Sequence, residues 1–127
     1  MVKQLTLVAL GGGAGSALRY LTSLYFMRSF SCNFPLGTFV VNIAGSFIIG
    51  LLVGLSVCCG ILNNELRFLL IIGFCGGYTT FSTFSVESLR LFEAGNYYIL
   101  ALYISASIIA GLLAVLGGNA LARIIAQ

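Results

Sequence analysis

The chain of 127 residues is 60% apolar and only 7% charged, with six Lys or Arg, three Asp or Glu and no His. A soluble domain carries about 25% charged residues, so this composition excludes one and indicates an integral membrane protein. The net charge of +3 is dispersed, which leaves no basic patch to indicate nucleic acid as a partner. We expect one integral membrane domain over residues 1–127, crossing the lipid bilayer of the cell membrane several times.

The sequence contains few candidate catalytic residues. No histidine is present to activate a Ser or Cys nucleophile, and the four cysteines form no Cys-x-x-Cys pair. Zinc and transition-metal sites draw on His, Cys and carboxylates at short spacings, and the chain lacks such a cluster. We therefore predict that the protein is not an enzyme.

Four apolar segments follow one another along the chain, and a membrane span needs about 20 helical residues. We predict helices at about 4–26, 35–58, 66–92 and 97–122, joined by short loops. Pro35 suits the first turn of the second helix, with Ser31 or Asn33 as its N-cap. Four spans of this kind place both termini on the same side of the membrane.

Positive charges divide evenly between the two sides of this topology. Lys3, Arg67 and Arg123 would lie beside the termini, and Arg19, Arg28 and Arg90 on the opposite side. The positive-inside rule counts Lys and Arg near span ends, so three against three gives no preferred orientation. We expect the chain to insert both ways and to form an antiparallel homodimer. The alternative is that one orientation dominates through a bias that this count does not reveal.

The third span is interrupted by residues that a lipid-facing helix does not need. Gly76 and Gly77 are adjacent, and six of the eight residues from Tyr78 to Ser85 carry hydroxyls. Glycines weaken a helix, and hydroxyls need partners where water is absent. Irregular backbone at membrane depth is tolerated where it is buried in protein or lines a cavity. We predict a helix broken at its centre that lines a pathway; the alternative is a kinked helix whose hydroxyls bond back to its own carbonyls.

Small and polar residues repeat every four positions on the second and fourth helices, which allows close helix packing. The repeats are Asn42, Ser46, Gly50 and Gly54 on the second helix, and Tyr103, Ser107 and Gly111 on the fourth. Close packing explains the glycines. It does not explain the Asn42 amide, which needs a polar partner at membrane depth and is a functional candidate.

The polar and aromatic groups of these spans suit an anion. They are the Asn42 amide, the hydroxyls of Ser82, Thr83, Ser85, Tyr103 and Ser107, and the rings of Phe81 and Phe84. Hydrogen-bond donors and the positive edges of aromatic rings attract an anion, whereas cation channels often use carboxylate rings. Arg19 would add positive potential at a pore mouth, or extend to the membrane interface.

The sequence resembles the Fluc (CrcB) family of fluoride channels over nearly its full length. The resemblance is carried by Gly11-Gly12-Gly13 through Leu18-Arg19-Tyr20, by Pro35-Leu36-Gly37-Thr38-Phe39-Val40-Val41-Asn42 and, most specifically, by Gly73-Phe74-Cys75-Gly76-Gly77-Tyr78-Thr79-Thr80-Phe81-Ser82-Thr83-Phe84-Ser85-Val86-Glu87. It implies an all-α, four-helix, dual-topology membrane protein. Such a protein forms an antiparallel homodimer with two pores and exports fluoride passively from the cytoplasm.

The resemblance also implies roles for individual residues. Phe81 and Phe84 match paired phenylalanines whose ring edges face fluoride, and Asn42 matches a pore asparagine. Ser107, with Tyr103 one turn away, matches a hydroxyl site on the fourth helix. The remaining matches are a polar track (Ser82, Thr83 and Ser85), a nearby acidic position (Glu87) and the first-helix arginine (Arg19).

A cofactor is implied as well. Gly76 and Thr79 match helix-break positions whose carbonyls, from both subunits, hold a central structural sodium ion that is not transported. Carbonyl oxygens suit such a hard cation. Gly111 departs from the pattern, because some members carry a further serine there.

Two other functions fit four short helices less well. A small multidrug-type exporter would need a glutamate in its first helix, and no carboxylate occurs between Gln4 and Phe26. A packing subunit without a pathway would tolerate Leu at Asn42, Phe81 and Phe84.

Overall fold

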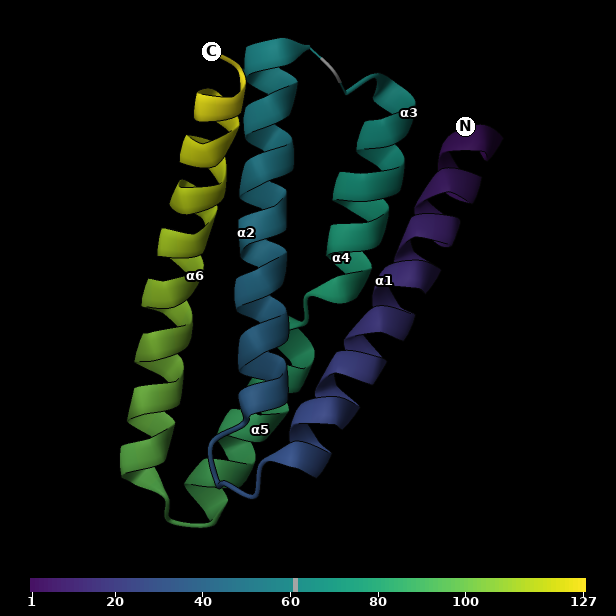
Figure 1. Cartoon of the computed structure of the whole chain (residues 1–127). Helices are drawn as coiled ribbons and strands as arrows, with labels where there is room; N and C mark the ends of the chain where they lie inside the picture. Colours follow the sequence, from purple (N-terminus) through teal and green to yellow (C-terminus); the bar gives the residue numbers. More distant parts are fainter. Residues whose placement is uncertain (61) are drawn as a thin grey trace.

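The computed structural model describes residues 1–60 and 62–127, and the regular structure of these residues is helical throughout. The elements are α1 (Val2–Ser29), α2 (Leu36–Cys59), α3 (Asn64–Leu66), η1 (Arg67–Cys75), α4 (Gly76–Tyr78), α5 (Phe81–Glu93) and α6 (Tyr97–Ile125) (Figure 1). The four predicted segments are all present, with ends within one helical turn of those predicted. Both termini lie at the same end of the bundle (Figure 1).

Three of the long segments are long and apolar enough to cross a membrane. They are Leu36–Cys59, Asn64–Glu93 and Tyr97–Ile125. α1 matches them in length, but Lys3, Arg19 and three successive glycines make it less apolar. The chain is a multi-pass membrane protein, and the three apolar segments establish this without α1.

The short connections are closed by backbone and side-chain hydrogen bonds. Asn63 caps α3, its Oδ1 accepting from the backbone N–H of Leu66 at 2.9 Å. The predicted cap of the second helix by Ser31 or Asn33 is wrong. The N-cap is Pro35, which makes no side-chain cap bond, and the Leu36 N–H donates to the Phe34 carbonyl at 2.8 Å instead.

α1 runs beside the first half of the third segment, and glycines set their separation (Figure 1). A Cβ on Gly11 would overlap the carbonyl oxygen of Leu69, and one on Gly15 would overlap that of Phe74. Both glycines are buried. Direct backbone contact of this kind is the usual use of small residues between membrane helices.

α2 and α6 make the most extensive contact between elements, again through glycines (Figure 1). Gly50 approaches the Val115 carbonyl, and Gly118 approaches the Phe47 carbonyl and the Leu51 N–H. The bundle therefore consists of two tightly packed pairs, α1 with the third segment and α2 with α6.

Gly118→Ala tests this contact. Its Cβ would overlap the α2 backbone, which cannot rotate away as a side chain can, so we expect the free energy of unfolding to fall by about 1–3 kcal/mol. Gly117→Ala is the matched control, because the nearest atom to its Cβ is Phe47 Cε2 at 4.0 Å. The measurement is denaturant-induced unfolding in detergent followed by circular dichroism. Equal midpoints for the two variants would contradict direct backbone contact at Gly118.

Candidate functional site

The third segment is broken between α4 and α5 at Thr79 and Thr80. Both have extended backbone, with φ −76° and ψ 157° at Thr79 and φ −150° and ψ 117° at Thr80. The sequence predicts Thr79 in the break correctly, whereas Gly76 lies in the helical turn before it, with φ −63° and ψ −36°. The reason is that Thr80 can start a new helix. Its Oγ1 accepts from the backbone N–H of Thr83 at 3.2 Å, as an N-cap does.

Asn42 holds the break in place. Its Oδ1 accepts from the Thr80 N–H at 2.8 Å, and its Nδ2 donates to the Thr80 carbonyl at 3.1 Å. The side chain thus satisfies both backbone groups of a residue that lies outside any helix at membrane depth. An unpaired backbone group there would be costly, since no water is present to replace the partner.

The same arrangement leaves two carbonyls without their helical donors. In an unbroken α-helix, the N–H of Thr80 would donate to Gly76 and that of Thr83 to Thr79. These two N–H groups bond to the Asn42 amide and the Thr80 hydroxyl instead. Across residues 1–60 and 62–127, no hydrogen bond reaches the carbonyl of Gly76 or Thr79.

A cavity of about 490 Å³ opens beside the break. Its lining comes from α2, from the π-helix η1 and from the break itself: Asn42, Gly45, Ser46, Ile49, Ile71, Ile72, Cys75, Gly76, Thr79, Thr80 and Phe81. The cavity therefore gathers residues from two segments that are about 40 positions apart in the sequence. Gly45 permits the close approach, because a Cβ there would overlap Thr79 Cγ2.

Phe81 and Phe84 lie together on the first turn of α5. Their ring centroids are 5.7 Å apart, and the Phe84 centroid is 5.0 Å from that of Tyr103 on α6. Phe84 is half-buried, but Phe81 is 79% exposed and lines the cavity. Phe81 therefore does not belong to the core of this chain.

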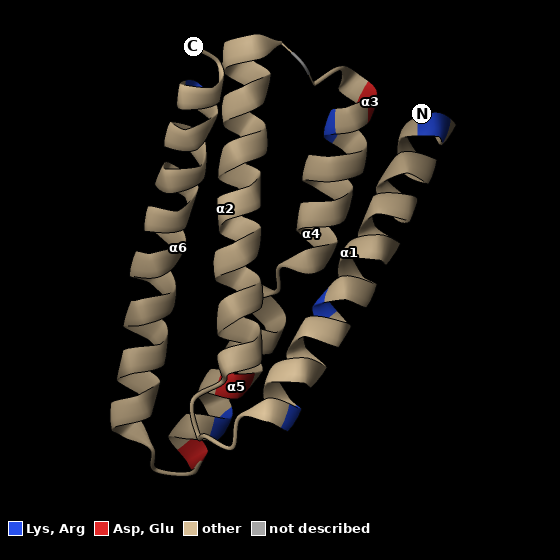
Figure 2. Cartoon of the chain, viewed as in Figure 1, with Lys and Arg blue, Asp and Glu red and all other residues tan. Residues whose placement is uncertain are grey.

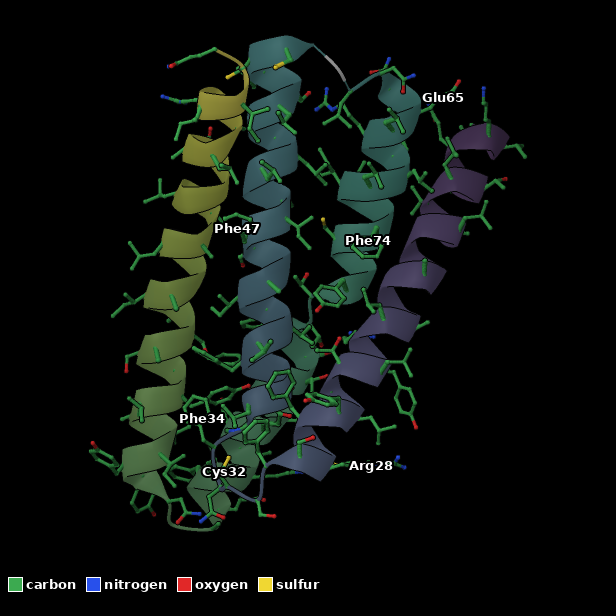
Figure 3. The ribbon with its side chains drawn as sticks, in the orientation of Figure 1. Arg28, Cys32, Phe34, Phe47, Glu65 and Phe74 are labelled. Carbon is green, nitrogen blue, oxygen red and sulfur yellow. The ribbon has the colours of Figure 1, made fainter. Side chains whose placement is uncertain are left out.

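Glu87 is the centre of a second polar cluster, nearer the α1–α2 loop. Thr38 donates to its Oε1 at 2.8 Å, and the Tyr103 hydroxyl donates to its Oε2 at 2.7 Å. Tyr103 is fully buried, and its ring meets Phe34, which lies at the loop end of the bundle, at 83° (Figure 3). Thr38 and Glu87 also line a cavity of about 370 Å³ beneath that loop.

The other hydroxyls around the break divide into two groups. Ser85 bonds back to the Phe81 carbonyl at 2.9 Å and Thr79 to the Cys75 carbonyl at 2.9 Å, so the kinked-helix alternative is correct for these two side chains. The Thr80 hydroxyl lies 3.0 Å from Thr83 Oγ1 and 3.4 Å from Ser82 Oγ.

Ser107 differs from these hydroxyls. Its Oγ is buried and is the only buried side-chain polar atom in the described part of the chain without a hydrogen-bond partner. A buried hydroxyl without a partner is costly, so this oxygen is available to a ligand.

Charged residues gather at the two ends of the bundle, with one exception on α1 (Figure 2). The exception is Arg19, which is half-buried and makes no ion pair with any described residue. Lys3 pairs with Glu65 at the end that carries the termini. Arg28, at the opposite end, points away from the bundle (Figure 3).

Two residues that complete the polar clusters, Thr38 and Thr80, were not predicted as site residues from the sequence. Thr38 lies four residues before Asn42 and so shares its helix face, which was a usable signal. Thr80 could have been recognised as an N-cap from its hydroxyl three residues before Thr83. Their partners, Glu87 and Asn42, are too distant in sequence to be inferred from spacing.

Comparison with known proteins places this chain in a family. Residues 6–119 match the family model described as CrcB-like protein, Camphor Resistance (CrcB). The chain belongs to the CrcB family. A protein of Azobacteroides pseudotrichonymphae named fluoride-specific ion channel FluC is 52% identical over 118 residues, covering 93% of this chain and 94% of the relative.

Other relatives carry the same name. One from Phocaeicola vulgatus is 49% identical over 92% of this chain and 96% of its own length, and one from Agrobacterium fabrum is 47% identical over 94% and 95%. The family assignment confirms the resemblance found in the sequence. These relatives are named as ion channels, which confirms the prediction that the chain is not an enzyme.

Replacing Asn42 by Leu tests the role of the amide in holding the break. The change leaves the Thr80 N–H and carbonyl unpaired, so we expect the free energy of unfolding to fall by about 1–3 kcal/mol. Asn119→Leu is the control, since the Asn119 amide makes no hydrogen bond with the described residues. Unfolding in detergent gives both values. A loss no larger for Asn42 than for Asn119 would show that the break does not depend on this amide.

Proposed function

We propose that this protein is a fluoride-selective channel through which fluoride leaves the cytoplasm passively, which lowers its toxicity. Three relatives with 47–52% identity over most of both chains are named as fluoride-specific channels. The observation in the chain that supports this function is the Asn42–Thr80 clamp, which holds the helix break beside a cavity lined by Asn42, Thr80 and Phe81.

The groups around the pathway are mostly hydrogen-bond donors. Fluoride leaving water loses a large hydration energy, which donors along the pathway must replace. Asn42 Nδ2 keeps a second N–H beyond the one that it gives to Thr80, and the Ser107 hydroxyl has no partner. The edges of Phe81 and Phe84 add the positive side of the ring quadrupole. Ser82, Thr83, Ser85 and Tyr103 extend this polar lining.

Arg19 and Glu87 act outside the innermost part of the pathway. Arg19 has no counter-ion in the described chain and raises the positive potential on α1. Glu87 accepts from Thr38 and Tyr103, which fixes the direction of both hydroxyls. We assign Glu87 a structural role, because it accepts both of these hydrogen bonds and its negative charge would repel fluoride.

The channel is proposed to work as an antiparallel homodimer with two pores. A second copy seated over this face would enclose the ring of Phe81, which is 79% exposed in the single chain. The even division of positive charge, three against three, agrees with insertion in both orientations.

We also propose that a structural sodium ion lies at the centre of the dimer. The carbonyls of Gly76 and Thr79 lack hydrogen bonds in the described chain and line the same cavity, so their chemistry fits a hard cation. When bound, sodium would supply the positive charge that balances these oxygens from both copies. The Asn42 and Thr80 side chains would keep the carbonyls free by holding the competing N–H groups.

Fluoride efflux from liposomes tests the function. Vesicles loaded with potassium fluoride and containing the purified protein should release fluoride on addition of a potassium ionophore, as read by a fluoride electrode. Vesicles loaded with potassium chloride serve as the selectivity control. If wild-type protein releases no fluoride above empty vesicles, the proposed function is wrong, and a packing subunit without a pathway becomes the better account.

Phe81→Ile and Phe84→Ile test the ring edges in the same assay. Isoleucine is apolar and close in volume but lacks the quadrupole, so we expect a folded dimer with fluoride efflux lowered at least ~10-fold, equivalent to about 1.4 kcal/mol on the barrier. Phe92→Ile, at the far end of α5, should conduct like wild type. Wild-type efflux from both test variants would show that these rings contribute only to packing.

Locking the orientation tests the antiparallel dimer. Several Lys residues added after Gln127 should force one topology, and Ala94→Lys with Asn96→Lys should force the other; Gly95 is kept because its φ is +75°. Each variant expressed alone should be inactive, and co-expression should restore efflux. Full activity from either locked variant alone would rule out an obligatory antiparallel dimer.

A further inference from the structure

Ser46 is a hydroxyl at membrane depth that the proposed function does not yet use. It is half-buried near the middle of α2, and its Oγ makes no hydrogen bond with any described residue. A serine in an apolar helix commonly bonds back to the carbonyl four residues earlier. The Ser105 hydroxyl on α6 donates in this way to the Ala101 carbonyl, whereas the Ser46 hydroxyl makes no such bond with the Asn42 carbonyl.

The helix face of Ser46 is already polar. Thr38, Asn42 and Ser46 follow at intervals of four, so they lie in line along α2. Thr38 bonds to Glu87 and Asn42 bonds to Thr80, so the first two contact the third segment. Ser46 continues the line but keeps its donor free.

The surroundings of Ser46 join two parts of the site. On one side it lines the 490 Å³ cavity together with Asn42 and Phe81. On the other side it faces α6, where a Cβ on Gly111 would lie 3.8 Å from Ser46 Oγ. Ser107, whose hydroxyl also lacks a partner, is one turn before Gly111 on the same helix. The Ser46 hydroxyl on α2 therefore lies next to the position that a side chain at Gly111 of α6 would occupy.

We propose that Ser46 is a further fluoride-coordinating residue of this chain, which supplies from α2 a hydroxyl that α6 lacks at Gly111. The proposal rests on the proposed function and adds one residue to its pathway. A free hydroxyl suits this role, because binding fluoride then breaks no existing hydrogen bond. A hydroxyl can also rotate toward an anion as it passes, which a backbone donor cannot do.

Liposome efflux of fluoride from Ser46→Ala tests the proposal. The change removes one oxygen and no hydrogen bond, so the fold should be kept while fluoride efflux falls about 10-fold. Ser46→Thr retains the hydroxyl and should conduct near the wild-type rate. Ser105→Ala is the matched control, because it removes a serine hydroxyl that is exposed and bonded within α6, away from the cavity, and it should leave efflux unchanged.

A serine at Gly111 tests whether α6 can supply the hydroxyl that Ser46→Ala removes. Ser46→Ala combined with Gly111→Ser should recover most of the lost efflux, since the new side chain has room and points at the vacated position. Wild-type efflux from Ser46→Ala would overturn the proposal, as would equal losses from Ser46→Ala and Ser46→Thr. If Gly111→Ser alone conducts normally but fails to rescue, the shared position is wrong. Wild-type protein that conducts no fluoride would instead defeat the proposed function.

Discussion

The structure depends on one constraint, which is that backbone exposed by a helix break at membrane depth must find partners within the protein. Asn42 meets this constraint by bonding to both polar groups of Thr80. Without those bonds, the N–H and the carbonyl of Thr80 would both be left unpaired at membrane depth. The position of the cavity, the direction of α5 and the placement of Phe81 on its first turn all follow from this contact.

Close helix packing makes the clamp possible. Asn42 has a short side chain, so α2 must approach the break closely before its amide can reach Thr80. Gly45, one turn further along α2, allows that approach because any Cβ there would meet Thr79. The glycines of α1 play the same part behind the third segment, where Gly77 packs directly against the Gly12 backbone. Of the two adjacent glycines of the third segment, Gly77 thus serves packing, whereas a Cβ on Gly76 would meet nothing within 4 Å; the threonines form the break.

The helices could be predicted from the sequence because a membrane span is defined by local properties, namely its length and the absence of charge. Asn42 could be singled out for the same reason, since a lone amide among apolar residues must have a partner. The identity of that partner could not be predicted, because Thr80 lies 38 positions away and the pairing depends on how the helices pack. The Thr38–Glu87–Tyr103 cluster was missed for this reason too, as its three members come from three different segments.

The π-helix η1 had no sequence signal either. Its hydrogen bonds span five residues instead of four, and apolar periodicity does not distinguish it from an α-helix over nine residues. It lies where α1 comes closest to the third segment, with Gly11 against Leu69 and Gly15 against Phe74. The π-helical hydrogen bonds of η1 therefore coincide with its close contact with α1. The sequence of η1 alone does not specify that contact.

Polar groups in this chain differ in whether they are already paired with another group of the chain. Some side chains make hydrogen bonds that hold the segments of the bundle together, namely those of Thr38, Asn42, Thr80 and Tyr103. Two kinds of group without a partner in the described chain matter for the proposed function. The hydroxyls of Ser46 and Ser107 can each donate to an anion, whereas the carbonyls of Gly76 and Thr79 can only accept, which favours a cation. Ser46, Gly76 and Thr79 all line the cavity beside the break, so under the proposed function one cavity would offer a donor to an anion and acceptors to a cation, from different atoms.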